Sequence, residues 1–68
     1  MNITLNGKSH TVENQCTIEQ LIEQLDLAGK RVAVEVNLDI IPRSEHAQHQ
    51  LQDDDKVEVV HAIGGGCV

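Results

Sequence analysis

Three consecutive glycines, Gly64, Gly65 and Gly66, stand close to the end of the sequence and are followed by Cys67 and Val68. Consecutive glycines lose more conformational entropy on ordering than other residues do, so we expect residues 64–68 to form a flexible tail. Because glycine carries no Cβ atom, such a tail can enter a narrow active site in another protein. The glycines therefore predict a chain that presents its own backbone to the catalytic residues of a partner. The alternative is an ordinary frayed terminus.

The other residues that could carry out chemistry form weaker patterns. Cys67 could carry sulfur or take part in redox chemistry, but no basic residue or histidine stands next to it to activate the thiol. Cys16 is interpreted as a partly buried loop residue. His46 and His49 have a spacing found in metal sites but lack a convincing third ligand, so we interpret both as polar surface residues. We therefore predict no catalytic residue and no metal site in this chain.

The length and the charge of the chain limit the classes of function. Its 68 residues can enclose one small core and leave few apolar side chains to wall a substrate pocket, so we expect one domain that is not an enzyme. The chain has 11 acidic and 5 basic residues and no aromatic residue, which makes nucleic acid and anionic membranes poor partners. A protein with a basic docking surface fits better, although an acidic balance also favours solubility alone.

The sequence also suggests a cellular compartment. It contains no apolar stretch of membrane-spanning length, and its first residues do not match a signal peptide. Two cysteines far apart in sequence are not a disulfide framework. We therefore expect a cytoplasmic protein with two free thiols.

Apolar periodicity predicts a hairpin followed by a helix. An alternating segment over residues 2–5 and an extended run over residues 8–12 flank Asn6-Gly7, a pair that fits a type I′ turn. A helix is predicted over residues 18–26. Thr17 and Gln20 match a capping box at its start, and its apolar residues share one face. Gly29 is expected to end the helical stretch.

The following segment predicts a strand, a turn and a short edge strand. Residues 32–36 alternate as a strand with one buried face, and residues 37–39 form a turn. Residues 40–41 resume an extended segment, which Pro42 limits to a sheet edge or a strand end. Ser44 is a possible cap for one helical turn, and Leu51 is predicted to anchor the polar segment to the core.

A last strand is predicted over residues 57–61, after a turn formed by residues 53–55. Val57 and Val59 face one side of this strand, and Glu58 and Val60 face the other. The helix must cover the apolar face of the sheet that these strands form. The order of elements therefore predicts an α+β fold with a mixed sheet packed on one helix.

Four segments of the sequence match the pattern of a known family. They are MNITLNGK at the start, TIEQLIEQL in the predicted helix, VAVEVNLDIIPRSE, and LQDDDKVEVVHAIGGG. With these segments the chain resembles the ThiS sulfur carriers, and more distantly the ubiquitin-like β-grasp superfamily, over residues 1–66. The resemblance implies a β-grasp domain over residues 1–63, with a mixed sheet of four to five strands on one main helix, and a flexible glycine tail over residues 64–68.

The resemblance also implies a role as a carrier that binds no cofactor itself. A ThiF-like adenylating enzyme would use Mg-ATP to convert the terminal glycine carboxylate into an acyl adenylate, which a sulfur nucleophile converts into a thiocarboxylate. The sulfur would come from a cysteine desulfurase or another sulfur donor. A ThiG-like thiazole synthase would receive it for the thiazole ring of thiamine. Gly66, or alternatively Gly65, would bear the carboxylate, with Gly64 and Gly65 as the flexible approach.

Partner docking is predicted on the last strand and its extension, at Val57, Val59, His61 and Ile63. The chain departs from the family in two places. Family members usually end at the glycines, whereas here Cys67 and Val68 follow, so we expect a metalloprotease to remove these two residues. Asp54 stands in a turn where the family often has glycine.

Two other functions remain compatible with the sequence. The chain could be a β-grasp sulfur carrier of another pathway, serving molybdopterin, cysteine or a secondary metabolite. It could also be a ubiquitin-like binding module that is never activated. In the second case, substitution of the glycines would leave function untouched.

Overall fold

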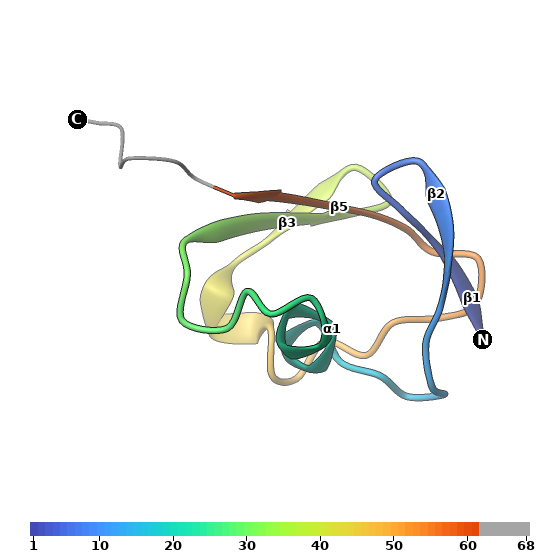
Figure 1. The fold of residues 1–68 in the computed structure, drawn as a ribbon, viewed down its shortest axis with the longest axis horizontal. Coiled ribbons are helices and arrows are strands. Elements are labelled where there is room, and N and C mark those ends of the chain that lie inside the picture. The colour runs from blue at the N-terminus through green and yellow to red at the C-terminus, as the bar shows by residue number, and fades with distance from the viewer. Residues whose placement is uncertain (62–68) are drawn as a thin grey trace.

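The computed structural model describes residues 1–61 of the chain. These residues form five strands, one α-helix and one short 3-10 helix: β1 (Asn2–Leu5), β2 (Lys8–Thr11), α1 (Ile18–Gln24), β3 (Val32–Val36), β4 (Asp39–Ile41), η1 (Arg43–Glu45) and β5 (Lys56–His61). The strands make one mixed sheet in the order β2-β1-β5-β3-β4, and α1 lies on one side of it (Figure 1). The predicted α+β arrangement is confirmed, with five strands in the sheet.

Strand β5 lies in the middle of the sheet and leads directly to the C-terminal residues. It runs parallel to β1, from Thr4↔Lys56 to Leu5↔Val57, and antiparallel to β3 over five residue pairs that end at Val32↔His61. The pairing with β1 therefore stops four residues before β5 ends. Within residues 1–61, the last part of β5 has no neighbouring strand on the β1 side.

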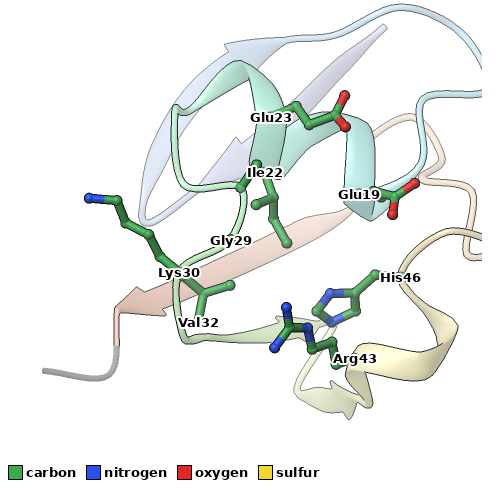
Figure 2. Close-up of a pocket in the computed structure, with 9 residues that line it drawn as sticks. Glu19, Ile22, Glu23, Gly29, Lys30, Val32, Arg43 and His46 are labelled. Atoms are coloured by element: carbon green, nitrogen blue, oxygen red, sulfur yellow. The ribbon is translucent and has the colours of Figure 1, made fainter. Parts of the chain in front are cut away.

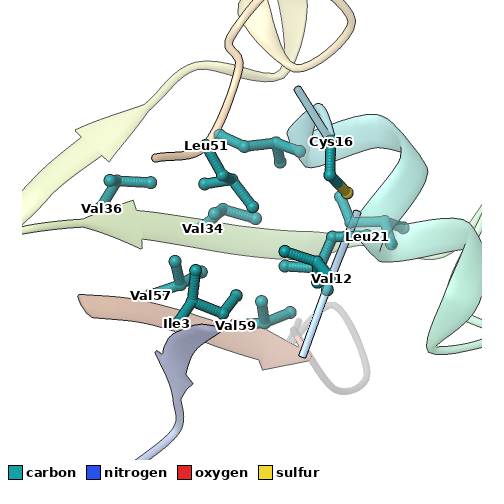
Figure 3. Packing of buried hydrophobic residues seen from close by; sticks show 11 residues of the cluster. Ile3, Val12, Cys16, Leu21, Val34, Val36, Leu51, Val57 and Val59 are labelled. Carbon is teal, nitrogen blue, oxygen red and sulfur yellow. The ribbon is translucent and has the colours of Figure 1, made fainter. Parts of the chain in front are cut away.

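The core fills the space between the helix and one face of the sheet (Figure 3). Strand residues alternate between this inner face and the solvent, as the period of two in β-structure requires. The buried cluster has residues from α1, β1, β3, β5 and the connecting loops: Ile3, Val12, Cys16, Ile18, Leu21, Ile22, Val34, Val36, Leu51, Val57 and Val59. The predicted anchoring of the polar segment by Leu51 is confirmed.

The start of helix α1 follows the sequence prediction. The backbone N–H of Gln20 donates to the Thr17 hydroxyl oxygen at 3.1 Å, and the backbone N–H of Thr17 donates to the Gln20 side-chain oxygen at 3.0 Å. These two reciprocal bonds form a capping box and satisfy donors that have no partner within the helix. The capping box explains why the helix begins at Ile18.

The end of helix α1 differs from the prediction. Gln24 is its last residue, and Asp26, at a φ of 61°, takes the left-handed conformation that turns the chain away. The N–H of Leu27 donates to the carbonyl of Ile22 at 3.0 Å, the bond that defines a Schellman cap. Gly29 lies beyond this cap, in the loop to β3. The predicted helix end at residue 26 was therefore two residues too late, because an aspartate took the position expected of a glycine.

Two type I′ turns connect the strand pairs. In the first, Asn6 and Gly7 have φ values of 51° and 82°, as predicted. In the second, Asn37 and Leu38 have φ values of 52° and 73°, and the turn contains these two residues alone because the next residue already belongs to β4. Leu38 thus occupies a position that favours glycine, with 79% of its surface exposed.

Smaller differences concern the polar segment. Pro42 precedes the short helix η1, and no side chain caps it, so the expected capping role of Ser44 is wrong.

The single α-helix within residues 1–61 has 7 residues, and no helix of that region is long and apolar enough to cross a bilayer.

Candidate functional site

The residues predicted to carry the chemistry lie outside the part of the chain that the structure describes. These are Gly66 and its alternative Gly65, the approach residue Gly64, and the docking residue Ile63. The structure does define the strand that precedes them, because β5 extends to His61. Strand β5 is therefore the described element nearest in sequence to the predicted site.

The predicted docking role of Val57 and Val59 is wrong for their side chains. Val57 is 0% exposed and Val59 is 8% exposed, and both pack against the helix side of the sheet (Figure 3). The physical reason is that the more apolar face of a central strand must cover the core. His61, the third predicted docking residue within the described part of the chain, is exposed.

The opposite face of the sheet presents a different set of side chains. Glu35 pairs with Ile40 of β4 on one side and with Glu58 of β5 on the other, and Ala33 pairs with Val60 in the adjacent row. We call these five residues the outer patch. Ile40 is 71% exposed and Val60 is 58% exposed, and they lie in adjacent rows of this face.

The outer patch combines apolar and acidic character. Glu35 and Glu58 stand directly opposite each other on neighbouring antiparallel strands. Like charges in this position destabilise a sheet. They also create a negative potential beside the apolar side chains, which attracts a surface rich in lysine or arginine. The outer patch therefore combines exposed apolar side chains with negative charge.

Sequence reasoning assigned Glu58 and Val60 to a common face but did not select that face for docking. The signal was present in the alternation, because Val60 is a large apolar residue on the face away from the valines that fill the core. The contribution of Ile40 depends on the register between β3 and β4, which the sequence alone does not determine.

Cys16 is a buried thiol. It is 2% exposed, and its Sγ donates to the carbonyl oxygen of Thr17 at 3.4 Å. Burial, and then the nearby carboxylate of Glu13, raise the pKa of this thiol above its usual range. Both the burial and the raised pKa disfavour the thiolate, which is the nucleophilic form.

The two histidines of the polar segment lie in different environments. His46 was expected on the surface, but it is 6% exposed and its Nε2 donates to the carbonyl oxygen of Ile41 at 3.0 Å. That partner explains why a polar ring is tolerated in a buried position. His49 is half-buried. Within residues 1–61, no group of three or more His, Cys, Asp or Glu side chains is placed to hold a metal ion.

The ring of His46 borders a shallow cavity of about 170 Å³ between the helix, the loop to β3 and η1 (Figure 2). Two carboxylates, from Glu19 and Glu23, and two cations, from Lys30 and Arg43, line it. Their charges balance, so the cavity carries no net charge that would select an ionic ligand.

Residues 3–66 match the sequence model of the ThiS family. The sulfur carrier protein ThiS of Escherichia coli is 35% identical over 66 residues, which cover 97% of this chain and 100% of that protein. A crystal structure of the thiamine biosynthesis protein ThiS from Geobacter metallireducens superposes with a TM-score of 0.82 at 33% identity, covering 97% of this chain and 100% of that one.

A longer relative contains a similar segment. The thiazole synthase of Paramagnetospirillum magneticum is 41% identical over 66 residues. The alignment covers 97% of this chain, which spans 20% of the length of that protein.

Proposed function

This chain belongs to the ThiS family, and we propose that it is a sulfur carrier protein of thiamine biosynthesis, a protein co-substrate rather than an enzyme. The observation that carries this proposal is the match over residues 3–66, which includes the glycines as well as the folded domain. The sulfur carrier protein ThiS of Escherichia coli, which the match covers over its whole length, supports it. The crystal structure with the same fold is that of a thiamine biosynthesis protein.

The chemistry would proceed at the carboxylate of Gly66. A ThiF-like adenylating enzyme transfers AMP from Mg-ATP to this carboxylate, and pyrophosphate leaves. A hydrosulfide ion, released from the persulfide of a cysteine desulfurase by a thiol reductant or supplied by another sulfide donor, then attacks the carbonyl carbon. The bond to the AMP oxygen breaks, and a thiocarboxylate remains after AMP leaves. Activation is needed because a carboxylate is a poor electrophile, whereas a mixed anhydride with phosphate has a good leaving group.

The Gly66 carboxylate must first be made available. In the 68-residue chain, Gly66 is joined to Cys67 by a peptide bond and has no free carboxylate. We propose that a metalloprotease hydrolyses this bond and releases the residues that follow. Gly64 and Gly65 then form a narrow approach that the active site of the adenylating enzyme can accommodate.

The outer patch is proposed as the docking surface for the adenylating enzyme. Its acidic residues and the formal net charge of -6 favour a partner with lysine and arginine side chains around an apolar contact. Gly66 lies six residues after Val60, and an extended chain of that length spans at most about 20 Å. A partner that binds the patch can therefore also reach the charging site.

The thiazole synthase is proposed as the acceptor of the sulfur. Support comes from the thiazole synthase of Paramagnetospirillum magneticum, which contains a segment similar to this chain within its own sequence. Joining a carrier-like segment and a synthase segment in one chain would raise the effective concentration of each for the other.

The direct test uses the chain ending at Gly66, incubated with Mg-ATP, an adenylating enzyme of the ThiF type and a sulfide source. The expected product has one oxygen replaced by sulfur, as read by intact mass. The matched controls are the 68-residue chain and Gly66→Ala, and neither should be charged. If the wild-type chain ending at Gly66 stays unmodified, a binding module that is never activated becomes the better account.

A further inference from the structure

Strand β5 extends past the end of β1. Beyond that point, a side chain makes the hydrogen bonds to β5 that a longer β1 would make. After Leu5 the backbone turns at Asn6, whose N–H donates to the carbonyl oxygen of Val57 at 2.9 Å. The Asn6 side chain then reaches the next residue of β5 that faces β1. Its Oδ1 accepts from the N–H of Val59 at 2.9 Å, and its Nδ2 donates to the Val59 carbonyl oxygen at 3.3 Å. The amide thus supplies the donor and the acceptor that a further β1 residue would have supplied.

A second asparagine holds the other end of β5. The N–H of Asn37 donates to the Lys56 carbonyl oxygen at 2.7 Å, and its Oδ1 accepts from the N–H of Lys56 at 3.0 Å. Its Nδ2 donates to the carboxylate of Asp55 at 3.0 Å. Asn6 and Asn37 are both the first residue of a type I′ turn, with φ values of 51° and 52°. Two equivalent side chains therefore fix β5, one at its start and one near its end.

The two asparagines differ in what they hold. Lys56 begins β5, far along the strand from the residues that lead to the glycines. Val59 stands between Glu58 and Val60, two residues of the outer patch, and only two described residues follow it. On the β1 side, Asn6 is the last group that ties β5 to the sheet within residues 1–61.

We infer that Asn6 is a positioning residue for charging, which holds the end of β5 in the geometry that the adenylating enzyme recognises. This inference rests on the proposed function. Without the Asn6 amide, the N–H and the carbonyl of Val59 would form hydrogen bonds with water instead, and the end of β5 would move more freely. Docking would then have to order Glu58 and Val60, and such ordering weakens association. The chemistry at Gly66 itself would be unchanged.

The test compares Asn6→Gly with Asn37→Gly. Glycine adopts a positive φ without strain, so both turns are retained, and each variant loses the two hydrogen bonds of one amide. In the chain ending at Gly66, the rate of adenylation is measured against carrier concentration. Asn6→Gly should raise KM about fivefold with kcat unchanged, whereas Asn37→Gly should leave both near the wild-type values.

Amide hydrogen exchange in the 68-residue chain gives a readout that is independent of charging. The Val59 amide should exchange at least about tenfold faster in Asn6→Gly but not in Asn37→Gly. Should Asn6→Gly fold poorly, Asn6→Asp keeps the acceptor for the Val59 N–H, replaces the donor with a carboxylate oxygen and adds one negative charge. This variant should show the same KM effect in weaker form.

Each outcome has a distinct meaning. An equal rise of KM in both glycine variants, or a fall of kcat in Asn6→Gly with KM unchanged, would overturn the positioning role. The same holds if wild type is charged and Asn6→Gly is charged identically. Failure of wild type to be charged at all would instead overturn the proposed function and, with it, this inference.

Discussion

Val59 and Val60 are consecutive residues of β5 that face opposite sides of the sheet, with 8% and 58% of their surfaces exposed. One contributes to the core beside α1, and the other belongs to the outer patch. Strand β5 therefore contributes both to the buried core and to the surface proposed for docking. Substitutions at these neighbouring positions should have separable effects.

Val60→Lys and Val60→Glu should impair charging without unfolding the protein. Both remove an apolar contact, and the lysine also repels a basic partner. We expect Val60→Lys to raise the KM for adenylation about tenfold or more, and Val60→Glu to raise it less. The free energy of unfolding should change by about 0.5 kcal/mol or less, as for most surface substitutions.

Val59→Ala is the matched control on the core face. It removes two buried methyl groups and should lower the free energy of unfolding by about 2 kcal/mol, while leaving the KM of the folded protein unchanged. Denaturant unfolding and adenylation kinetics together separate the two positions. Equal KM values for wild type and Val60→Lys would rule out the outer patch as the docking surface.

Leu38→Gly should stabilise the fold. A left-handed conformation costs a residue with a Cβ atom about 1–2 kcal/mol, and glycine avoids this strain but loses about 0.5–1 kcal/mol of extra chain entropy. The net expectation is a gain of about 0.5–1 kcal/mol in the free energy of unfolding, measured in denaturant.

Leu38→Ala serves as the comparison, because alanine keeps the Cβ atom and the left-handed strain. It should give no comparable gain. A similar stabilisation in both variants would show that removal of an exposed apolar side chain, rather than relief of backbone strain, is responsible.

Because of Cys16, the free energy of unfolding should decrease as the pH rises above the ordinary pKa range of a thiol. Its pKa is raised in the folded protein by burial and by Glu13, so the unfolded chain loses the thiol proton first. The stabilisation is complete below the pKa of the unfolded thiol and is lost as the pH rises through the folded value.

The measurement is the free energy of unfolding of wild type and Cys16→Ala between about pH 7 and about pH 10. Three lysines titrate in both proteins, so the difference between the two curves isolates Cys16. Parallel curves would contradict the prediction.

Local features of this fold could be predicted from the sequence. The Asn6-Gly7 turn and the Thr17–Gln20 capping box each depend on residues within three positions of each other, and both are present as predicted. The helix end was missed because Asp26, rather than Gly29, adopts the left-handed cap. Conformational propensity alone does not determine whether Asp26 or Gly29 adopts the left-handed conformation that ends the helix.

The docking face depended on contacts between distant residues. Alternation separated Val57 and Val59 from Val60, but the position of the helix determines which set is buried. Likewise, the Asn6 side chain contacts Val59, 53 residues later, and no sequence pattern encodes this contact. The glycines were recognisable from composition and family resemblance, and their role remains a prediction.

The most direct measurement is the intact mass of the protein isolated from its own cells. We expect a chain that ends at Gly66 and has one oxygen replaced by sulfur, so that proteolytic release and charging are seen in one spectrum. A population that retains Cys67 and Val68 and contains no added sulfur, in cells actively making thiamine, would contradict the proposed carrier function.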